Sequence, residues 1–395
     1  MPAQVPRGGR AAEFWNAYTR DITRDDLRRL ITHEARDAWR FFAQGVEAKD
    51  LDALPWHHRL PAYGRRLFLA FTLRLSPARR ILYGASLLFA LLGLVGLFEG
   101  LHFVWLPAGV FSLPLLVPAW AGGTVPLLIG FVLVNLLVLF EVADRLTLKN
   151  DLEIAREIQH AMLPHDTYRA IGVEVHGQTR PANTVGGDFY DIQPLADGRL
   201  VVALGDVAGK GSPAALLMAL LLAMLRTLLD EGLDPAALAG RLNLQIWRHA
   251  PRSRFITLFV AVFDPDSGEL VFVNAGQTPP LLRRVSGDTE WLSEGGIALG
   301  LRESSRYTAA TRALAPGDVL VLYSDGITEA EDPDGVPYEE AGLVRAVGAM
   351  PDATAPDLGA ALMRDVARHA REERFADDLT LVVLRRLPLP PSVGT

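Results

Sequence analysis

Two long uncharged apolar runs constrain the fold of this chain more than any other feature. Residues 81–98 and residues 121–140 each contain 18 or more consecutive residues without a charged side chain. A helix of about 20 apolar residues crosses the hydrocarbon core of a bilayer. Both runs are therefore predicted to be transmembrane spans within a membrane region at residues 81–144. A buried helical hairpin in a soluble protein is the alternative, but two such long runs rarely fit into a globular core.

The segment between the two runs is also apolar, but it contains Pro107, Pro114 and Pro118. Proline interrupts a helix because it lacks a backbone N–H and its ring clashes with the preceding turn. We expect an apolar, proline-rich loop here. A third span through this segment remains the alternative.

Basic residues flank the membrane region and are absent from it. Five arginines precede the first run, and the second run is followed by two basic residues: Arg65, Arg66, Arg74, Arg79, Arg80, and then Arg145 and Lys149. Positive charge marks the cytoplasmic side, so both ends are predicted to be cytoplasmic and the number of spans even. The chain is expected to be a multi-pass protein of the inner (cytoplasmic) membrane. Residues 1–80 are expected to form a cytoplasmic helical region.

Composition excludes several classes of function. The formal net charge of −7 argues against general nucleic-acid binding. The chain has no cysteine, which excludes disulfides, zinc–thiolate sites and thiol catalysis.

A short helix is predicted to leave the membrane at residues 145–164. Its apolar residues recur at steps of three and four and end before Pro164: Leu148, Leu152, Ala155, Ile158 and Met162. This connector helix either forms a homodimer or packs on its own domain, and the pattern fits both.

Residues 165–388 have a different pattern, with short β-rich runs that lie next to each other along the chain. The runs 255–263 and 269–274 flank the turn sequence DPDSG and predict a hairpin. Helices are expected at 213–230 and about 355–371, and the apolar run 213–229 is predicted to be a core helix because Arg226 interrupts it. This arrangement predicts an α+β domain with largely antiparallel sheets, followed by a tail at 389–395.

Aspartates recur at boundaries between apolar strands and loops in this region. They occur in VGGDFYD, VVALGDV, VLVLYSDG and FADDLTLVVL, as Asp188, Asp206, Asp325, Asp377 and Asp378. A single aspartate of this kind is usually part of a turn. If these carboxylates converge, they cannot all remain ionised without bound cations.

Oxygen ligands suit hard ions such as Mg²⁺ or Mn²⁺, and we expect two or more of them. The predicted nucleophile is a metal-bound water, with no other catalytic side chain. A P-loop is excluded at GDVAGKGS, because only three residues separate Gly205 from the Gly209–Lys210 pair.

Six sequence blocks over about residues 150–388 resemble the bacterial SpoIIE-like serine/threonine phosphatases, a branch of the metal-dependent type 2C (PPM) superfamily. In chain order the blocks are AREIQHAMLP, VGGDFYDI, GDVAGKGSPAALLMA, NAGQTPPLL, LYSDGITEA and DDLTLVVL. The resemblance implies an α-β-β-α sandwich phosphatase domain, here preceded by an α-helical membrane region.

The resemblance also implies roles for individual residues. Asp188, Asp206, the carbonyl of Val207, Asp325 and Asp377 would bind metal. Four residues would support the site: Gly187, Gly205, Gly326 and Asp378, the last by holding the neighbouring loop. The phosphate-binding residue is unknown, and Arg180 is a weak candidate.

In this family the usual substrate is a phosphorylated anti-sigma-factor antagonist, a small STAS-domain protein in a partner-switching pathway. A non-catalytic membrane receptor or scaffold with a phosphatase-like fold is the alternative, although all expected ligand carboxylates are present.

Overall fold

The computed structural model describes residues 68–69, 72, 75–99, 101–108, 111–118, 123–371 and 375–389. Most of the predicted N-terminal region 1–80 and nearly all of the tail 389–395 lie outside these residues. The chain divides into two compact units, Met1–Arg145 and Leu146–Thr395.

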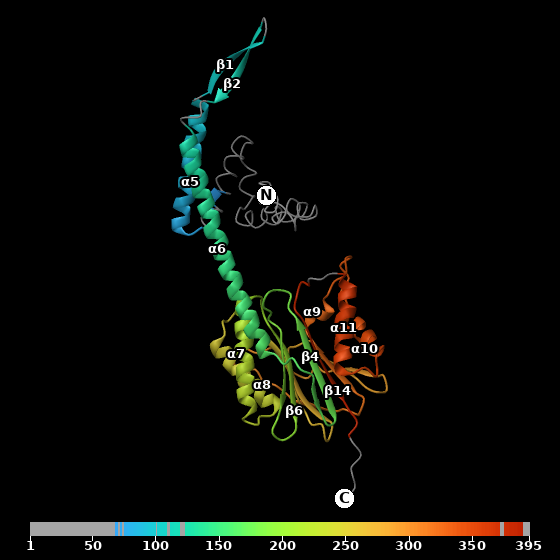
Figure 1. Cartoon of the computed structure of the whole chain (residues 1–395). Coiled ribbons are helices and arrows are strands. Elements are labelled where there is room, and N and C mark those ends of the chain that lie inside the picture. Colours follow the sequence, from blue (N-terminus) through green and yellow to red (C-terminus); the bar gives the residue numbers. More distant parts are fainter. Residues whose placement is uncertain are drawn as a thin grey trace, which may run out of the picture. The chain divides into compact units, whose positions relative to one another are not determined.

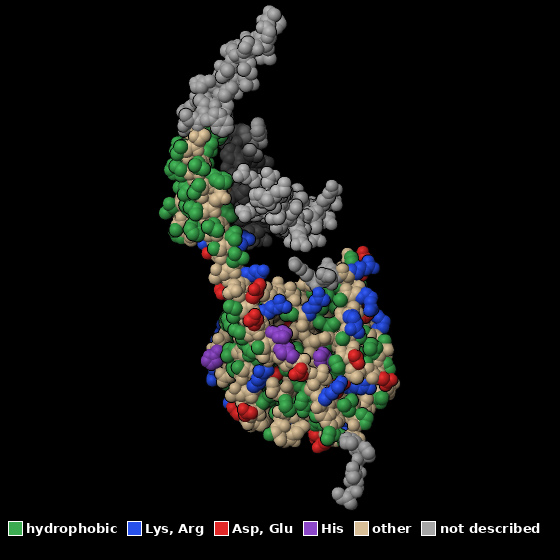
Figure 2. Space-filling model, in the orientation of Figure 1, with side chains coloured by type: hydrophobic (Ala, Val, Ile, Leu, Met, Phe, Trp, Pro, Cys, Tyr) green, Lys and Arg blue, Asp and Glu red, His purple; other side chains and the backbone are tan. Residues whose placement is uncertain are grey.

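Two helices form the described core of the first unit: α5 (Pro77–Glu99) and the N-terminal part of α6 (Thr124–Met162). Glycines let these helices approach closely, because a Cβ at Gly93 would lie 2.5 Å from Leu127 Cγ and one at Gly123 would lie 2.3 Å from the Gly93 carbonyl oxygen. Figure 2 shows that hydrophobic side chains cover the outer surface of this pair. Both helices are long and apolar enough to cross a membrane.

The segment between these helices forms a β-hairpin. Strand β1 (Leu101–Ala108) pairs antiparallel with β2 (Phe111–Pro118). The helix that a third span would require is therefore not formed here.

Helix α6 continues without a break from the second apolar run into the predicted connector. It is 39 residues long and ends at Met162, two residues before Pro164. Proline at that position cannot donate the hydrogen bond that would extend the helix.

Two six-stranded sheets form the centre of the second unit. The first sheet has the order β10-β9-β13-β14-β4-β3 and the second has the order β11-β8-β7-β6-β5, with β12 paired to β8. All these pairs are antiparallel except β11–β8. The strands are β3 (Tyr168–Ala170), β4 (Val173–Arg180), β5 (Phe189–Pro194), β6 (Leu200–Val207), β7 (Ile256–Phe263), β8 (Glu269–Ala275), β9 (Leu281–Arg283), β10 (Thr289–Trp291), β11 (Gly295–Gly296), β12 (Ala310–Ala313), β13 (Val319–Tyr323) and β14 (Leu379–Arg386).

Helices cover the outer faces of both sheets. Figure 1 shows α7 (Ser212–Leu229) and α8 (Pro235–His249) on one side, and α10 (Glu339–Gly348) and α11 (Ala355–Ala370) on the other. A short helix, α9 (Asp325–Thr328), follows β13. The predicted α-β-β-α sandwich is confirmed, although α8 and α10 were not predicted.

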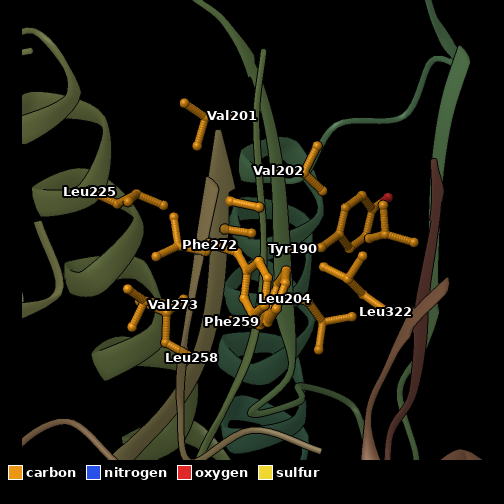
Figure 3. Close-up of a cluster of buried hydrophobic side chains, with 14 of the residues drawn as sticks. Tyr190, Val201, Val202, Leu204, Leu225, Leu258, Phe259, Phe272, Val273 and Leu322 are labelled. Atoms are coloured by element: carbon orange, nitrogen blue, oxygen red, sulfur yellow. The ribbon is translucent and has the colours of Figure 1, made fainter. Parts of the chain in front are cut away.

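Alternate residues of the central strands fill two layers of the core. Figure 3 shows Leu204 and Leu322 between the sheets, whereas Leu258 and Val273 face Leu225 of α7. This period of two is the expected geometry of a strand buried on both faces.

Helix α7 is as apolar as a transmembrane helix but belongs to this core. Its most apolar 18-residue window is 39% buried, compared with 11% for each of the other two candidate spans. Leu221, Leu222 and Leu225 are fully buried in the domain, in agreement with the predicted core helix.

Candidate metal centre

The five aspartates identified in the sequence come from strand ends in both sheets. Asp188 precedes β5, and Asp206 lies near the end of the adjacent strand β6. In the other sheet, Asp325 follows β13, and the pair Asp377–Asp378 precedes its neighbour β14. Antiparallel pairing places the end of one strand beside the start of the next, so each sheet brings its carboxylates to one edge.

Three of these carboxylates, from both sheets, line one cavity, whereas Asp188 and Asp325 do not line it. Asp206 from one sheet and Asp377 and Asp378 from the other line a single cavity of about 60 Å³. Asp325 interacts electrostatically with Asp206 and with Asp377.

Burial and mutual repulsion raise the pKa values of three of these groups. The pKa of Asp206 rises to about 6, mainly because of burial and then because of the charges of Asp325, Asp377 and Asp378. Burial, followed by repulsion from Asp206, raises the pKa of Asp188 well above its usual value, and the hydroxyl groups of Thr380 and Ser324 offset part of the increase. The pKa of Asp325 is raised by burial and by Asp377. The site therefore disfavours its own ionised carboxylates.

Asp188 carries the clearest sign of an unmet interaction. Its side chain is only 5% exposed, and its Oδ2 atom has no hydrogen-bond partner among the described residues. Buried carboxylate oxygens are normally paired, so an unpaired one needs an explanation.

Asp378 has a different environment from the other four aspartates. Its Oδ1 accepts a hydrogen bond from the Ala182 amide and its Oδ2 accepts one from the Gly187 amide, both at 2.8 Å. Asp378 thereby holds the loop that precedes Asp188.

A second residue, Gln159 of α6, holds the same loop. Its side-chain amide donates to the Gly186 carbonyl at 2.8 Å and its Oε1 accepts from the Gly186 N–H at 3.1 Å. Sequence reasoning did not identify Gln159, because its partner is 27 positions away. Its only local signal is that it is a polar residue within the apolar connector pattern.

The three glycines predicted to support the site lie close to carboxylate or carbonyl oxygens. A Cβ at Gly187 would lie 2.7 Å from Asp206 Oδ1 and 3.0 Å from the Val207 carbonyl oxygen. A Cβ at Gly326 would lie 2.2 Å from the Asp378 carbonyl oxygen, and one at Gly205 would lie 2.2 Å from that of Thr257. Any larger residue at these positions would have to displace the neighbouring oxygens.

One cation already interacts with the site. Lys210 Nζ lies 2.9 Å from Asp377 Oδ2, and this hydrogen bond raises the pKa of Lys210. Arg180, the weak candidate for phosphate binding, instead places its guanidinium 5.0 Å from the centre of the Phe375 ring. Arg180 is not among the residues that line the cavity.

The donor set fits a hard divalent cation in its chemistry. It consists of oxygen atoms, it includes an unpaired buried carboxylate oxygen, and its pKa values are raised by burial and by repulsion that a cation would relieve. Within the described ranges, however, no three acidic or histidine side chains are already positioned to hold one ion. Mg²⁺ usually binds through one or two carboxylates and keeps several waters, so a cluster of three is not required.

Sequence comparison relates this domain to known proteins. Residues 196–387 match the family model "Stage II sporulation protein E (SpoIIE)". The phosphoserine phosphatase RsbU of Bacillus subtilis is 27% identical over 240 residues, which is 60% of this chain and 71% of RsbU. Protein IcfG of Synechocystis is 29% identical over 46% of this chain, but the match spans only 33% of IcfG.

Solved structures agree with these matches. The RsbU and RsbW domains of Rv1364c from Mycobacterium tuberculosis superpose with a TM-score of 0.50 at 25% identity, covering 56% of this chain and 63% of that one. The SiaA-PP2C domain of Pseudomonas aeruginosa gives a TM-score of 0.53 at 23% identity, covering 62% of this chain and 98% of that domain. The second similarity concerns the fold alone.

Proposed function

Because the chain carries a protein phosphatase domain of the SpoIIE type, we propose that it is a membrane-anchored, metal-dependent enzyme that hydrolyses phosphoserine or phosphothreonine in a protein. The observation that carries this proposal is the meeting of Asp206 with Asp377 and Asp378 from the other sheet around one cavity, next to the buried Asp188, whose Oδ2 is unpaired and whose pKa Asp206 raises.

Four carboxylates and one carbonyl would hold Mg²⁺ or Mn²⁺, with two or more ions bound: Asp188, Asp206, Val207 (through its carbonyl), Asp325 and Asp377. When bound, such ions supply charge for the phosphoryl oxygens and activate a water as the nucleophile. No covalent phosphoenzyme is needed.

The residues around the cluster position it. Asp378 and Gln159 together hold the backbone from Ala182 to Gly187, which leads directly to Asp188. A carboxylate held on a fixed backbone loses less conformational freedom when it binds a ligand, which favours a preorganised site.

We further propose that the substrate is a phosphorylated STAS-domain protein of a partner-switching pathway. The similarity to a phosphoserine phosphatase and to a protein that contains RsbU and RsbW domains supports this proposal. Incubation of the enzyme with phosphorylated STAS proteins from the same genome would test it.

Helices α5 and α6 are proposed to be two spans of the inner (cytoplasmic) membrane, with the phosphatase domain in the cytoplasm. We propose that a membrane or extracytoplasmic signal acts through α6. Two observations support this route: α6 is continuous from Thr124 to Met162, and its residue Gln159 binds Gly186 next to the carboxylate cluster. The connector could also form a homodimer, since Leu148 and Ile158 are 61% and 58% exposed.

The catalytic proposal is tested with the full-length chain purified in detergent. Wild-type protein should hydrolyse p-nitrophenyl phosphate and a phosphoserine peptide only when Mn²⁺ or Mg²⁺ is added, and Asp325→Asn should be inactive. Equal rates for the two proteins would refute the assignment.

The signalling proposal needs a separate experiment. Deletion of residues 1–140 should change the phosphatase rate or the oligomeric state. If both stayed at the values of the intact chain, α6 would not be the route of control.

A further inference from the structure

Lys210 occupies a distinctive position at the carboxylate cluster. It lies in the loop that joins β6 to α7, four residues after Asp206. Its Nζ atom pairs with Asp377 Oδ2 at 2.9 Å and donates to the Ala376 carbonyl at 2.7 Å. Among the described residues that line the cavity, Lys210 alone is positively charged.

Lys210 also borders a larger hollow beside the cavity. This hollow has a volume of about 550 Å³, and its lining includes Gly326, Phe375 and Asp377. Lys210 and Asp377 line both spaces. A ligand that reaches the carboxylates from the hollow therefore passes the Lys210 side chain.

The loop that carries Lys210 is anchored just upstream of it, whereas the Lys210 side chain is exposed. Ala208, two residues before Lys210, is held at both ends: its N–H donates to the Phe255 carbonyl at 2.9 Å and its own carbonyl accepts from Arg254 at 2.5 Å. The side chain of Lys210 nevertheless remains 55% exposed. A long flexible stem on a fixed base can exchange one anionic partner for another.

Charge balance indicates which anion would replace Asp377 as the partner of Lys210. A phosphorylated side chain carries a charge of about −1.5 to −2, and the acidic cluster would repel it. A cation on Asp377 would also repel the Lys210 ammonium and weaken its present ion pair. The nearest new partner for the Lys210 ammonium is then the phosphoryl group of the proposed substrate.

We propose that Lys210 binds a phosphoryl oxygen of the phosphoprotein substrate and gives up its ion pair with Asp377 when it does so. This inference rests on the proposed phosphatase function. It assigns the phosphate-binding role to the β6–α7 loop, whereas Arg180 stacks on Phe375. Lysine suits this role because it binds phosphate as a compact point charge.

The test uses the full-length chain in detergent with Mn²⁺ and three variants: Lys210→Met, Lys210→Arg and the control Arg199→Met. Arg199 immediately precedes the opposite end of β6, roughly 20 Å along the strand from Asp206, and it pairs with the exposed Asp197. The control removes a positive charge next to the same strand but at its other end, away from the site. Circular dichroism and Mn²⁺ affinity establish that each variant is folded and loaded.

Lys210→Met should weaken the binding of inorganic phosphate, measured by calorimetry, about tenfold and should raise KM for a phosphoserine peptide by a similar factor. We expect kcat to change less than KM, because the ammonium contacts the phosphoryl group before and during the reaction. Lys210→Arg should recover most of the phosphate affinity, and Arg199→Met should match the wild type.

Two results would overturn the inference. One is wild-type phosphate affinity and KM in Lys210→Met. The other is a change in Mn²⁺ affinity with no change in phosphate affinity, which would make Lys210 only a counter-ion of Asp377. Failure of the wild-type chain to hydrolyse the peptide would refute the proposed function instead, and phosphate calorimetry would still report on Lys210.

Discussion

Two buried aspartates, three residues apart, have opposite environments. Asp191 in β5 is fully buried, and its carboxylate accepts hydrogen bonds from Arg226 Nε at 2.8 Å, Gln193 at 2.8 Å and the Ile192 amide at 3.1 Å. Asp188, just before β5, is almost as buried but leaves Oδ2 unpaired and lies near Asp206.

The difference separates a carboxylate that builds the fold from one that is kept for a ligand. A buried charge is tolerated when hydrogen bonds and an opposite charge replace water, as they do around Asp191. Arg226 also donates to the carbonyl of Met162 at 2.6 Å, so this ion pair fastens the end of α6 to β5. Around Asp188 the hydroxyl groups of Thr380 and Ser324 offset only part of this cost and Oδ2 stays unpaired, so its burial costs folding free energy that a bound cation would recover.

The largest effect that tests this contrast is on catalysis. Asp188→Asn should reduce Mn²⁺-dependent turnover by a factor of roughly 10³ or more, because it removes a proposed metal ligand. Without metal, its free energy of unfolding should equal or exceed that of the wild type, because a repelled charge is removed. Steady-state kinetics and urea unfolding measure the two quantities.

The control for this variant is Asp266→Asn, at the exposed turn between β7 and β8. It should leave turnover and stability unchanged. Near-normal turnover in Asp188→Asn would remove Asp188 from the metal centre.

The second largest expected effect is on stability and concerns Asp191, the other aspartate in this comparison. Asp191→Asn should lower the free energy of unfolding by about 2–3 kcal/mol, because it leaves Arg226 without its buried counter-charge. The estimate is below the usual cost of breaking a buried pair, because the Arg226 side chain is 36% exposed. Turnover per folded molecule should stay close to that of the wild type.

The same substitution three residues apart therefore has opposite expected outcomes. If Asp191→Asn lost activity without losing stability, or if Asp188→Asn lost stability without losing activity, the distinction between the two carboxylates would be wrong.

A smaller effect concerns the loop that carries Asp188. Gln159→Met removes both hydrogen bonds to Gly186 while keeping a side chain of similar length. We expect Mn²⁺ affinity to fall about tenfold, since leaving buried backbone groups unpaired costs about 1–3 kcal/mol. Amide hydrogen exchange over residues 182–188 should become faster.

Glu157→Met, on an exposed position of the same helix, serves as the comparison for Gln159. Unchanged metal affinity together with unchanged exchange in Gln159→Met would show that α6 does not position the site.

Local sequence signals predicted the individual helices and strands better than the tertiary contacts between them. The hairpin β7–β8 follows from two β-branched runs around a turn, and α7 follows from a long apolar run. Helix α8 was not predicted, although Asp234 immediately precedes it and accepts from the amides of Ala236 and Ala237, and Pro235 is its first residue. These are ordinary helix-start signals.

The site depends on tertiary pairing that spacing alone does not contain. The sequence identifies the five aspartates as strand-end residues, but the register Phe189↔Gly205 in one sheet and Tyr323↔Leu381 in the other brings them to a common edge. The contacts of Gln159 with Gly186 and of Lys210 with Asp377 join positions 27 and 167 residues apart. No local pattern encodes such distances.

The smallest expected effect is on the pH dependence of stability without divalent ions. Burial and neighbouring charges raise the pKa of Asp206 to about 6, above its value of 3.8 in an unstructured chain. The folded state therefore holds this proton more tightly than the unfolded state. The resulting stabilisation is complete below about pH 4 and is lost as the pH rises through about 6, a change on the order of 1–3 kcal/mol.

Urea unfolding between pH 4 and 7.5 should show this decline in the wild type and a smaller one in Asp206→Asn. Saturating Mn²⁺ at the upper end of this range should restore stability in the wild type only, because a cation replaces the proton as the partner of the carboxylate. An identical pH profile in both proteins would mean that the carboxylates do not repel one another strongly enough to need a cation.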